Sequence, residues 1–282
     1  MFKQWMTKGS LQLLSEPAFS RLVGKIAQAD NVPRGLLRAV IKRYVDFYGV
    51  DLSEIAEPLE SFASFDDFFT RALKPGVHTI DPDPGVAVSP VDGRILNMGR
   101  VSGGRIDQVK GRSYLLEELL DSKDHSRRFE SGHYITIYLS PKDYHRIHCP
   151  VAGKVTGYRY IPGRLYPVNN MGVTNVDKLF AVNERLVSFV KSSLGEVAVV
   201  KVGATNVGMI TASYHDVCTN VGRRTAYDES LRKSAPIDKG GELGRFHLGS
   251  TVVLVTANEN LIPVSLQPED YVRMGQPLLR LK

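Results

Sequence analysis

The sequence predicts an α+β fold, with a mainly antiparallel β-sandwich or barrel-like body that follows a set of N-terminal amphipathic helices. Two observations support this prediction. Apolar side chains recur at helical spacing in the first fifty residues, and from about residue 80 the chain changes to short alternating runs punctuated by Gly and Pro. Because these runs follow one another closely, antiparallel pairing is expected. We therefore expect a helical segment over residues 1–60 and a β-rich domain over residues 61–282.

The helical pattern is clearest in residues 31–49, NVPRGLLRAVIKRYVDFYG, where Pro33 suits a helix start. The apolar residues at helical spacing are Leu37, Val40, Ile41, Tyr44 and Tyr48, and the basic residues at other positions are Arg34, Arg38, Lys42 and Arg43. The pattern is repeated upstream by Phe19, Leu22, Val23 and Ile26, which Trp5, Met6, Leu11, Leu13 and Leu14 precede. Residues 62–73, FASFDDFFTRAL, are typical of a short amphipathic helix that links this segment to the β region.

Four runs carry the strand prediction most strongly. They are HYITIYL at 133–139, GKVTGYRYI at 153–161, VAVVKVG at 197–203 and STVVLVT at 250–256. Each is rich in β-branched or aromatic residues and is short enough for one strand.

The positive charge of the chain is concentrated at its N-terminus. The formal net charge is +6, and residues 1–50 hold eight basic and three acidic side chains, so that residues 51–282 carry only +1. Such an asymmetry suggests that the N-terminal segment meets an anionic surface, a membrane or a nucleic acid. Because the rest is nearly neutral and has no aromatic-basic binding motif, we do not expect nucleic acid as a partner.

Several classes of protein are disfavoured. Two cysteines, Cys149 and Cys218, cannot form a disulfide framework and lack the spacing of a structural zinc site, which suggests a reducing compartment. Apolar runs of the roughly 18 residues that span a bilayer are missing, and residues 1–10 lack the apolar region of a signal peptide.

Two segments sixty residues apart share a pattern and differ at one informative position. SPVDGRI at 89–95 and CPVAGKV at 149–155 both place Pro and Gly before a β-branched residue, which suits a turn that enters a strand. The first copy has Asp92 where the second has Ala152. The carboxylate of Asp92 either caps its own turn or has a separate, functional role.

Two histidines lie close together in YHRIHCP, at His145 and His148. Side chains three residues apart point to opposite faces of a strand but can share one face in a helix or a turn. Packing or surface exposure explains such a pair as readily as chemistry does. A metal site needs a third ligand, and neither His133 nor His215 is placed to suggest one, so we expect no metal.

In GRFHLGSTVVLV, the residues Leu248, Gly249, Ser250 and Thr251 lie where a Gly-containing turn leads into a buried strand. A tight turn that needs Gly for its backbone conformation is a sufficient explanation of this pattern. The pattern is not the G-x-S-x-G elbow of hydrolases.

Taken together, LGST, YHRIH and the Asp-Gly of SPVDGRI resemble the phosphatidylserine decarboxylase family, whose members depend on a pyruvoyl group. The resemblance continues, in the same order along the chain, through QVKGRSYLLEELL, YIPGRLYPVN, LFAVNERLV and VGATNVGMI, and covers roughly residues 60–282. Departures are small: Val91 stands before Asp92 where relatives often have Ala, and Cys149 is not a requirement of the family.

The resemblance implies a precursor that cleaves itself between Gly249 and Ser250, into a β chain of residues 1–249 and an α chain of residues 250–282. It implies that Ser250 attacks its own peptide bond with His148 as the base and Asp92 orienting that base, in the manner of a Ser-His-Asp triad. Ser250 then becomes a covalent pyruvoyl group, the cofactor and Schiff-base site. His145 is expected to act in the decarboxylation step.

The reaction implied is decarboxylation of phosphatidylserine to phosphatidylethanolamine and carbon dioxide. The expected partners are phosphatidylserine in an anionic membrane and the two chains of one precursor, with a homodimer as a further option. The location implied is peripheral, on the cytoplasmic face of the cell membrane, with the N-terminal helices as the point of contact. These helices could instead cap the β body or form a dimer interface. Two other functions stay open: a pyruvoyl-dependent decarboxylase of a soluble amino acid, and an inactive membrane-binding β module.

Overall fold

The computed structural model describes residues 15–109, 111–205 and 209–282. The predicted apolar positions Trp5, Met6, Leu11, Leu13 and Leu14 lie outside the described residues. Within them, the N-terminal region forms helices α2 (Pro17–Ala27) and α3 (Arg34–Tyr48), the short turn η1 (Leu52–Glu54) and helix α4 (Phe65–Phe69). The predicted helix after Pro33 is confirmed, and it ends where Gly49 adopts a left-handed φ of +72°. The helix predicted over 62–73 is shorter than the pattern and begins after Ser64, whose side chain accepts a hydrogen bond from Asp67 N.

The rest of the chain is mainly strand. The strands are β1 (Val86–Val88), β2 (Gly93–Arg100), β3 (Arg105–Val109), β4 (Arg112–Leu115), β5 (His133–Leu139), β6 (Arg146–His148), β7 (Gly153–Ile161), β8 (Arg185–Ser192), β9 (Gly195–Val202), β10 (Met209–Ala212), β11 (Tyr227–Ile237), β12 (Glu242–His247), β13 (Ser250–Thr256), β14 (Leu261–Pro263), β15 (Tyr271–Val272) and β16 (Pro277–Leu281). The four runs predicted as strands are confirmed as β5, β7, β9 and β13. The helices between them are α5 (Leu116–Leu120), α6 (Lys123–Arg127), α7 (Asn170–Asn175) and α8 (Leu179–Val182).

Over the described part of the chain, the strands form one eight-stranded sheet in the order β11-β7-β8-β9-β13-β5-β2-β15, two three-stranded sheets, β10-β12-β6 and β1-β16-β14, and the pair β3-β4. The neighbours in the large sheet pair antiparallel, as predicted. Its edge strands β11 and β15 do not pair with each other in the described structure, so the sheet stays open and the fold is an α+β sandwich rather than a barrel.

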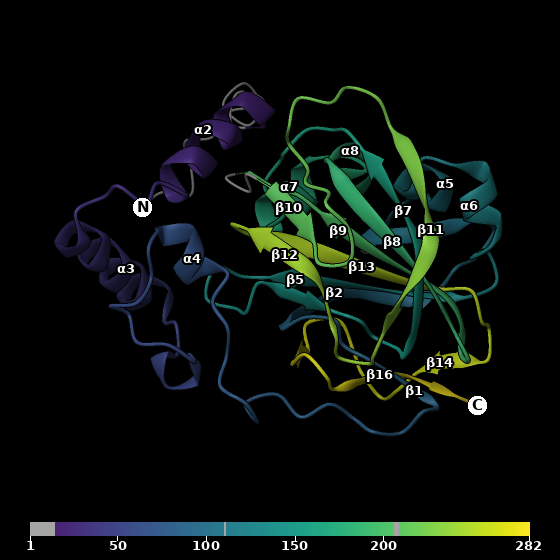
Figure 1. Ribbon diagram of the computed structural model, residues 1–282. Helices are drawn as coiled ribbons and strands as arrows, with labels where there is room; N and C mark the ends of the chain where they lie inside the picture. The colour runs from purple at the N-terminus through teal and green to yellow at the C-terminus, as the bar shows by residue number, and fades with distance from the viewer. Residues whose placement is uncertain (1–14, 110, 206–208) are drawn as a thin grey trace.

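The large sheet is covered on both faces (Figure 1). On one face its side chains pack against the two small sheets, through residues such as Ile147, Phe246 and Leu278. On the other face they pack against the short helices, through residues such as Leu119 and Phe180. A strand that is buried on both faces has a continuous run of apolar residues instead of alternating apolar and polar residues. This explains the sequence of β13.

The N-terminal helices have a small core of their own at one end of the molecule, on the left of Figure 1. Leu37, Ile41 and Val45 of α3 pack there with Phe62 and Phe68. Other large apolar side chains of α2 and α3 stay exposed, namely Leu22, Ile26, Leu36, Val40, Phe47 and Tyr48.

Candidate active site

Strand β12 passes into β13 through a two-residue turn with left-handed backbone. The φ angle is +82° at Leu248 and +41° at Gly249. The predicted tight turn is therefore present, and Gly249 accepts this conformation easily. For Leu248 a left-handed conformation costs on the order of 1–3 kcal/mol, because its Cβ crowds the backbone. Strain is thus stored next to the peptide bond between Gly249 and Ser250.

Ser250 is the first residue of β13 and is fully buried, with 0% of its surface exposed. It pairs with Leu139 of β5. Within the described residues its hydroxyl oxygen has no hydrogen-bond partner. Burying an unsatisfied hydroxyl costs about 1–3 kcal/mol, so such groups are rare and call for an explanation.

His145 lies just before β6 and is also fully buried. Its carbonyl oxygen accepts from Phe246 N at 3.0 Å, three residues before Gly249. Its Nδ1 donates to the carbonyl oxygen of Asp143 at 2.7 Å, so the proton lies on Nδ1 and Nε2 carries a lone pair. Among the described atoms this Nε2 has no partner. Burial, with a smaller contribution from Arg71, lowers the pKa of His145 to about 3, so the ring is neutral at physiological pH.

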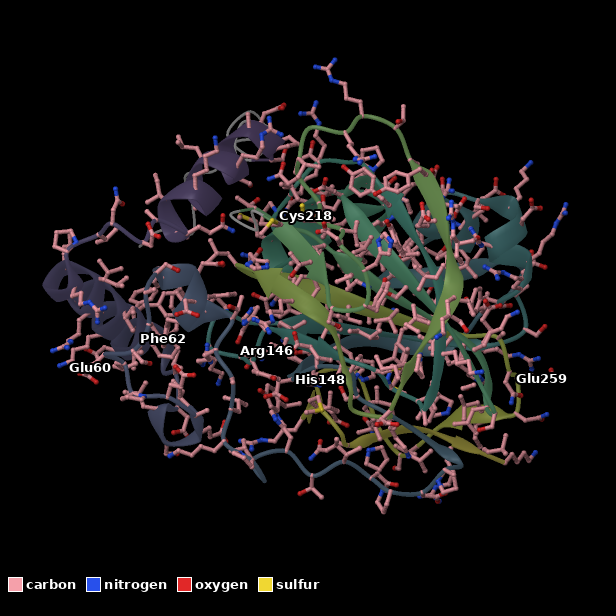
Figure 2. The ribbon with its side chains drawn as sticks, viewed as in Figure 1. Glu60, Phe62, Arg146, His148, Cys218 and Glu259 are labelled. Atoms are coloured by element: carbon pink, nitrogen blue, oxygen red, sulfur yellow. The ribbon has the colours of Figure 1, made fainter. Side chains whose placement is uncertain are left out.

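His148 ends β6 and has both ring nitrogens engaged. Nδ1 donates to the carbonyl oxygen of Gly240 at 2.7 Å, and Nε2 accepts from the Tyr144 hydroxyl at 3.1 Å. Burial lowers the pKa of His148, whereas Glu242, its partner in the register of β12, acts to raise it. In Figure 2 His148 lies next to Arg146 of the same strand.

Asp92 is buried, but its carboxylate does not contact His148. Oδ1 accepts from His78 Nε2 and from Met274 N, both at 2.7 Å. A direct hydrogen bond between Asp92 and His148 is therefore not formed in this structure, where both ring nitrogens of His148 have other partners. The hydrogen-bond partners of the Asp92 side chain are distant in sequence, so it does not cap its own turn here.

Asp92 and His148 nevertheless belong to one cluster, which we call the Asp92 cluster and which consists of Asp92, His78, Tyr144 and His148. The Tyr144 ring lies 5.5 Å from the ring of His78 and 5.5 Å from the ring of His148, between centroids. His78 and Tyr144 were not predicted from the sequence. No local pattern marks His78, and Tyr144 lies within YHRIH, where only the two histidines were considered.

The two similar segments that contain Asp92 and Ala152 lie against each other. Val88 N donates to the carbonyl oxygen of Pro150 at 2.9 Å, and His148 N donates to that of Pro90 at 2.8 Å. The repeated pattern thus has a structural cause, and these reciprocal backbone bonds bring His148 close to the Asp92 turn.

An apolar cavity of about 770 Å³ reaches the turn before Ser250. Its lining includes Leu248 and Gly249 at the turn, Phe69 of α4, and many apolar residues of the N-terminal helices, among them Val23, Ile26, Leu36, Val40 and Phe47. Phe69 also contacts His145, with ring centroids 4.0 Å apart. A smaller, polar cavity of about 190 Å³ is lined by Asp92 and Tyr144 of the Asp92 cluster, together with Arg71, Asp143 and Arg273.

No group of three His, Cys, Asp or Glu side chains suited to a metal ion occurs among the described residues. Of the helices in the same ranges, none has the length and apolar character that crossing a membrane requires.

Comparison with known proteins identifies the family of this chain. The sequence profile of the phosphatidylserine decarboxylase family matches residues 65–280. A phosphatidylserine decarboxylase proenzyme of Myxococcus xanthus is 43% identical over 267 residues, which are 94% of this chain and 95% of the relative. The proenzyme of Brevibacillus brevis is 42% identical over 97% of each chain, and that of Marinobacter nauticus is 46% identical over 84% of each. The family profile matches most of the chain, and these relatives are more than 40% identical over most of their length. The chain therefore belongs to the phosphatidylserine decarboxylase family, a family of carboxy-lyases.

Proposed function

We propose that this chain cleaves itself between Gly249 and Ser250 and then converts phosphatidylserine to phosphatidylethanolamine and carbon dioxide. The observation that carries the proposal is Ser250: a buried hydroxyl without a partner in the described structure, directly after a strained turn that lines a large apolar cavity. The family to which the chain belongs supports the same reaction.

In the self-cleavage, the Ser250 oxygen attacks the carbonyl carbon of Gly249. The bond from this carbon to the Ser250 nitrogen breaks, and the hydroxyl proton ends on that nitrogen. The ester then loses the Gly249 carboxylate as the Ser250 Cα gives up its proton, and water converts the remaining dehydroalanine into a ketone with release of ammonia. Rupture of the chain would also release the strain at Leu248.

Serine is a weak nucleophile and needs a base. Both candidate histidines have their proton on Nδ1, so both can offer Nε2. We assign the base to His148, because the nearby Glu242 favours its protonated form whereas Arg71 disfavours that of His145. Asp92 would act on this base from within the same cluster, and the Tyr144 hydroxyl must turn away from Nε2 before His148 can take the serine proton.

The residues present fit a pyruvoyl cofactor, because Ser250 is held at the start of a central strand with its side-chain oxygen unengaged. Such a group supplies an electron sink for the electrons that carbon dioxide leaves behind. The role proposed for His145 is to carry, at Nε2, the proton that replaces carbon dioxide. Nε2 has no partner among the described atoms, and because burial lowers the pKa of His145, a proton held there would be given up readily to the carbon that carbon dioxide leaves.

The apolar cavity favours a lipid over a soluble amino acid as substrate. Acyl chains would lie among the residues of α2 and α3, and Arg43, which also lines the cavity, would offer a cation to the lipid phosphate. We propose that residues 1–60 are the membrane-associating segment, on the cytoplasmic face, and that residues 61–282 are the catalytic domain. The exposed apolar side chains of α2 and α3, such as Ile26 and Phe47, support this arrangement.

Intact mass spectrometry and an activity assay test the proposal. Purified protein should consist of two chains, the smaller one beginning at residue 250 with a blocked, ketone-bearing end. It should release carbon dioxide from phosphatidylserine in detergent micelles and not from free serine. Ser250→Ala should give one uncut, inactive chain, with Thr251→Ala as the matched control that still cleaves. Intact, inactive wild-type protein would refute the proposal, and turnover of free serine would refute its lipid part.

A further inference from the structure

A second cavity, of about 510 Å³, lies where the first turn of α2 meets the segment between β10 and β11. Figure 1 shows this segment as the green loop that rises towards α2. Arg21 of α2 and Arg223 and Arg224 of the loop line it, together with Asn220, Glu16 and Glu184. We call this space the arginine cavity. It is separate from the apolar cavity at the Ser250 turn.

The arginines of this cavity are not neutralised by its acids. In the described structure Arg21, Arg223 and Arg224 have no carboxylate within ion-pair distance, since the salt bridge of Glu16 is with Arg164. Glu184 accepts from the Tyr160 hydroxyl at 2.7 Å and from Asn220 N at 2.8 Å, and burial raises its pKa. The three arginines outnumber the two carboxylates that line the cavity, so the cavity has an excess of positive charge that attracts an anion.

A buried amide in the same cavity also lacks an acceptor. Asn220 is only 5% exposed, and its Oδ1 accepts from Arg21 Nη1 at 3.2 Å. Its Nδ2 has no partner among the described residues. In addition, Pro17 and Ala18 of the first turn of α2 line the cavity, and the side chain of Glu16 does not cap this turn. A helix N-terminus without a cap adds further positive potential.

We propose that the arginine cavity binds the phosphate group of an anionic phospholipid that is not the reacting substrate. Guanidinium groups, an amide donor and a helix N-terminus are the groups that bind phosphate oxygens. The position of α2 favours a lipid over a free phosphate, because Arg21 lines the arginine cavity while Val23 and Ile26 line the apolar one. Leu22 and Ile26 are 58% and 66% exposed, so the same helix presents apolar side chains to a bilayer.

Flotation with vesicles of phosphatidylcholine alone, or mixed with phosphatidylglycerol, tests the proposal. Phosphatidylglycerol is anionic and lacks the amine and carboxylate of the substrate, so the result does not depend on the proposed decarboxylation. The double variant Arg223→Gln/Arg224→Gln should bind the anionic vesicles roughly thirtyfold more weakly at low salt, because each basic residue at such a surface contributes about 1 kcal/mol. Its activity in detergent micelles should be retained.

The matched control is Arg232→Gln/Lys233→Gln, which removes the same charge from two exposed residues of β11. This control should bind within about twofold of wild type, whereas diffuse attraction would weaken both doubles equally. Asn220→Asp keeps the shape of the side chain but replaces the unpaired donor with an acceptor, and it should weaken binding too.

Equal losses in the two doubles, or wild-type binding by Arg223→Gln/Arg224→Gln, would overturn the proposal. Titration with inorganic phosphate distinguishes the two sources of the anion. Saturable phosphate binding that the arginine double abolishes, together with unchanged vesicle binding, would assign the cavity to a free phosphate and refute the lipid.

Discussion

Replacement of Lys201 by methionine should stabilise the protein, and more so at neutral than at alkaline pH. Lys201 is on β9 and has 0% exposure. Its ammonium donates to the Ser188 hydroxyl and to the carbonyl oxygen of Val199, and no carboxylate of the described residues lies within ion-pair distance. Burial lowers the pKa of Lys201 to about 7 from its ordinary value of 10.5. The folded state therefore releases a proton that the unfolded chain keeps.

The size of the effect follows from this difference in pKa. Between pH 7 and 10.5 the unfolded state binds more protons at Lys201, so wild-type stability rises with pH, by about 1.4 kcal/mol per unit. Methionine has a similar volume and no charge, and the Ser188 hydroxyl keeps its bond to Tyr214 at 2.6 Å. The advantage of Lys201→Met should then be about 4 kcal/mol at pH 7 and about 1 kcal/mol at pH 9.5, as upper limits.

Thermal unfolding at several pH values measures this. Near pH 7 the Tm of Lys201→Met should exceed that of wild type by roughly 10 °C, and the gap should narrow as the pH rises. Lys191→Met, at an exposed position of β8, is the matched control and should show no such trend. A Tm difference that does not change with pH, or a variant less stable than wild type near pH 7, would refute the claim that burial of Lys201 disfavours its charged form and destabilises the fold.

Three further predictions concern the site. His148→Ala should slow self-cleavage by roughly 10²–10⁴-fold, as followed on a denaturing gel. His145→Ala should still cleave itself, but its release of carbon dioxide should fall by a similar factor in an activity assay. The reverse pattern would exchange the roles of the two histidines. His78→Gln should slow cleavage about as much as Asp92→Asn, and cleavage at the wild-type rate would show that His78 does not act in this step. Leu248→Gly, in a Ser250→Ala background, should raise stability by about 1 kcal/mol in denaturant unfolding. A lower stability would show that the Leu248 side chain contributes more than the strain costs.

The elements that local sequence determines were predictable. Strand β13 is a run of β-branched residues buried on both faces, and α3 combines a proline start, apolar residues at helical spacing and a glycine end. Each of these signals depends on residues that are neighbours in the chain. The strand and the helix could therefore be predicted without knowledge of the tertiary structure.

The connections within the site were not predictable in the same way. Asp92 and His78 are joined by a hydrogen bond across a loop, and Met274 reaches the same oxygen from near the other end of the chain. The ring nitrogens of His148 are occupied by Gly240 and Tyr144, which only the register of β6 with β12 and the loop before β6 determine. The sequence marked Asp92 and His148 as candidates but not their neighbours His78 and Tyr144, because these contacts depend on how separate segments pack.

The position of Ser250 means that the proposed self-cleavage need not break the fold. Residues 250–282, the 33 residues of the proposed α chain, begin with β13 at the centre of the large sheet, between β9 and β5. The same segment pairs with β2 through β15 and with β1 through β16. Four fully buried side chains of β13, Val252, Val253, Leu254 and Val255, together contribute roughly 6–12 kcal/mol of burial.

These contacts join residues after the cleavage site to residues before it. The proposed α chain should therefore stay bound after cleavage. It should co-elute with the larger chain in native size-exclusion chromatography. In a urea titration it should be released only as the β-sheet signal in circular dichroism is lost, in a single transition. Release at lower urea, with the sheet signal intact, would contradict this, because it would mean that the turn at Leu248 and Gly249 had been holding β13 in the sheet.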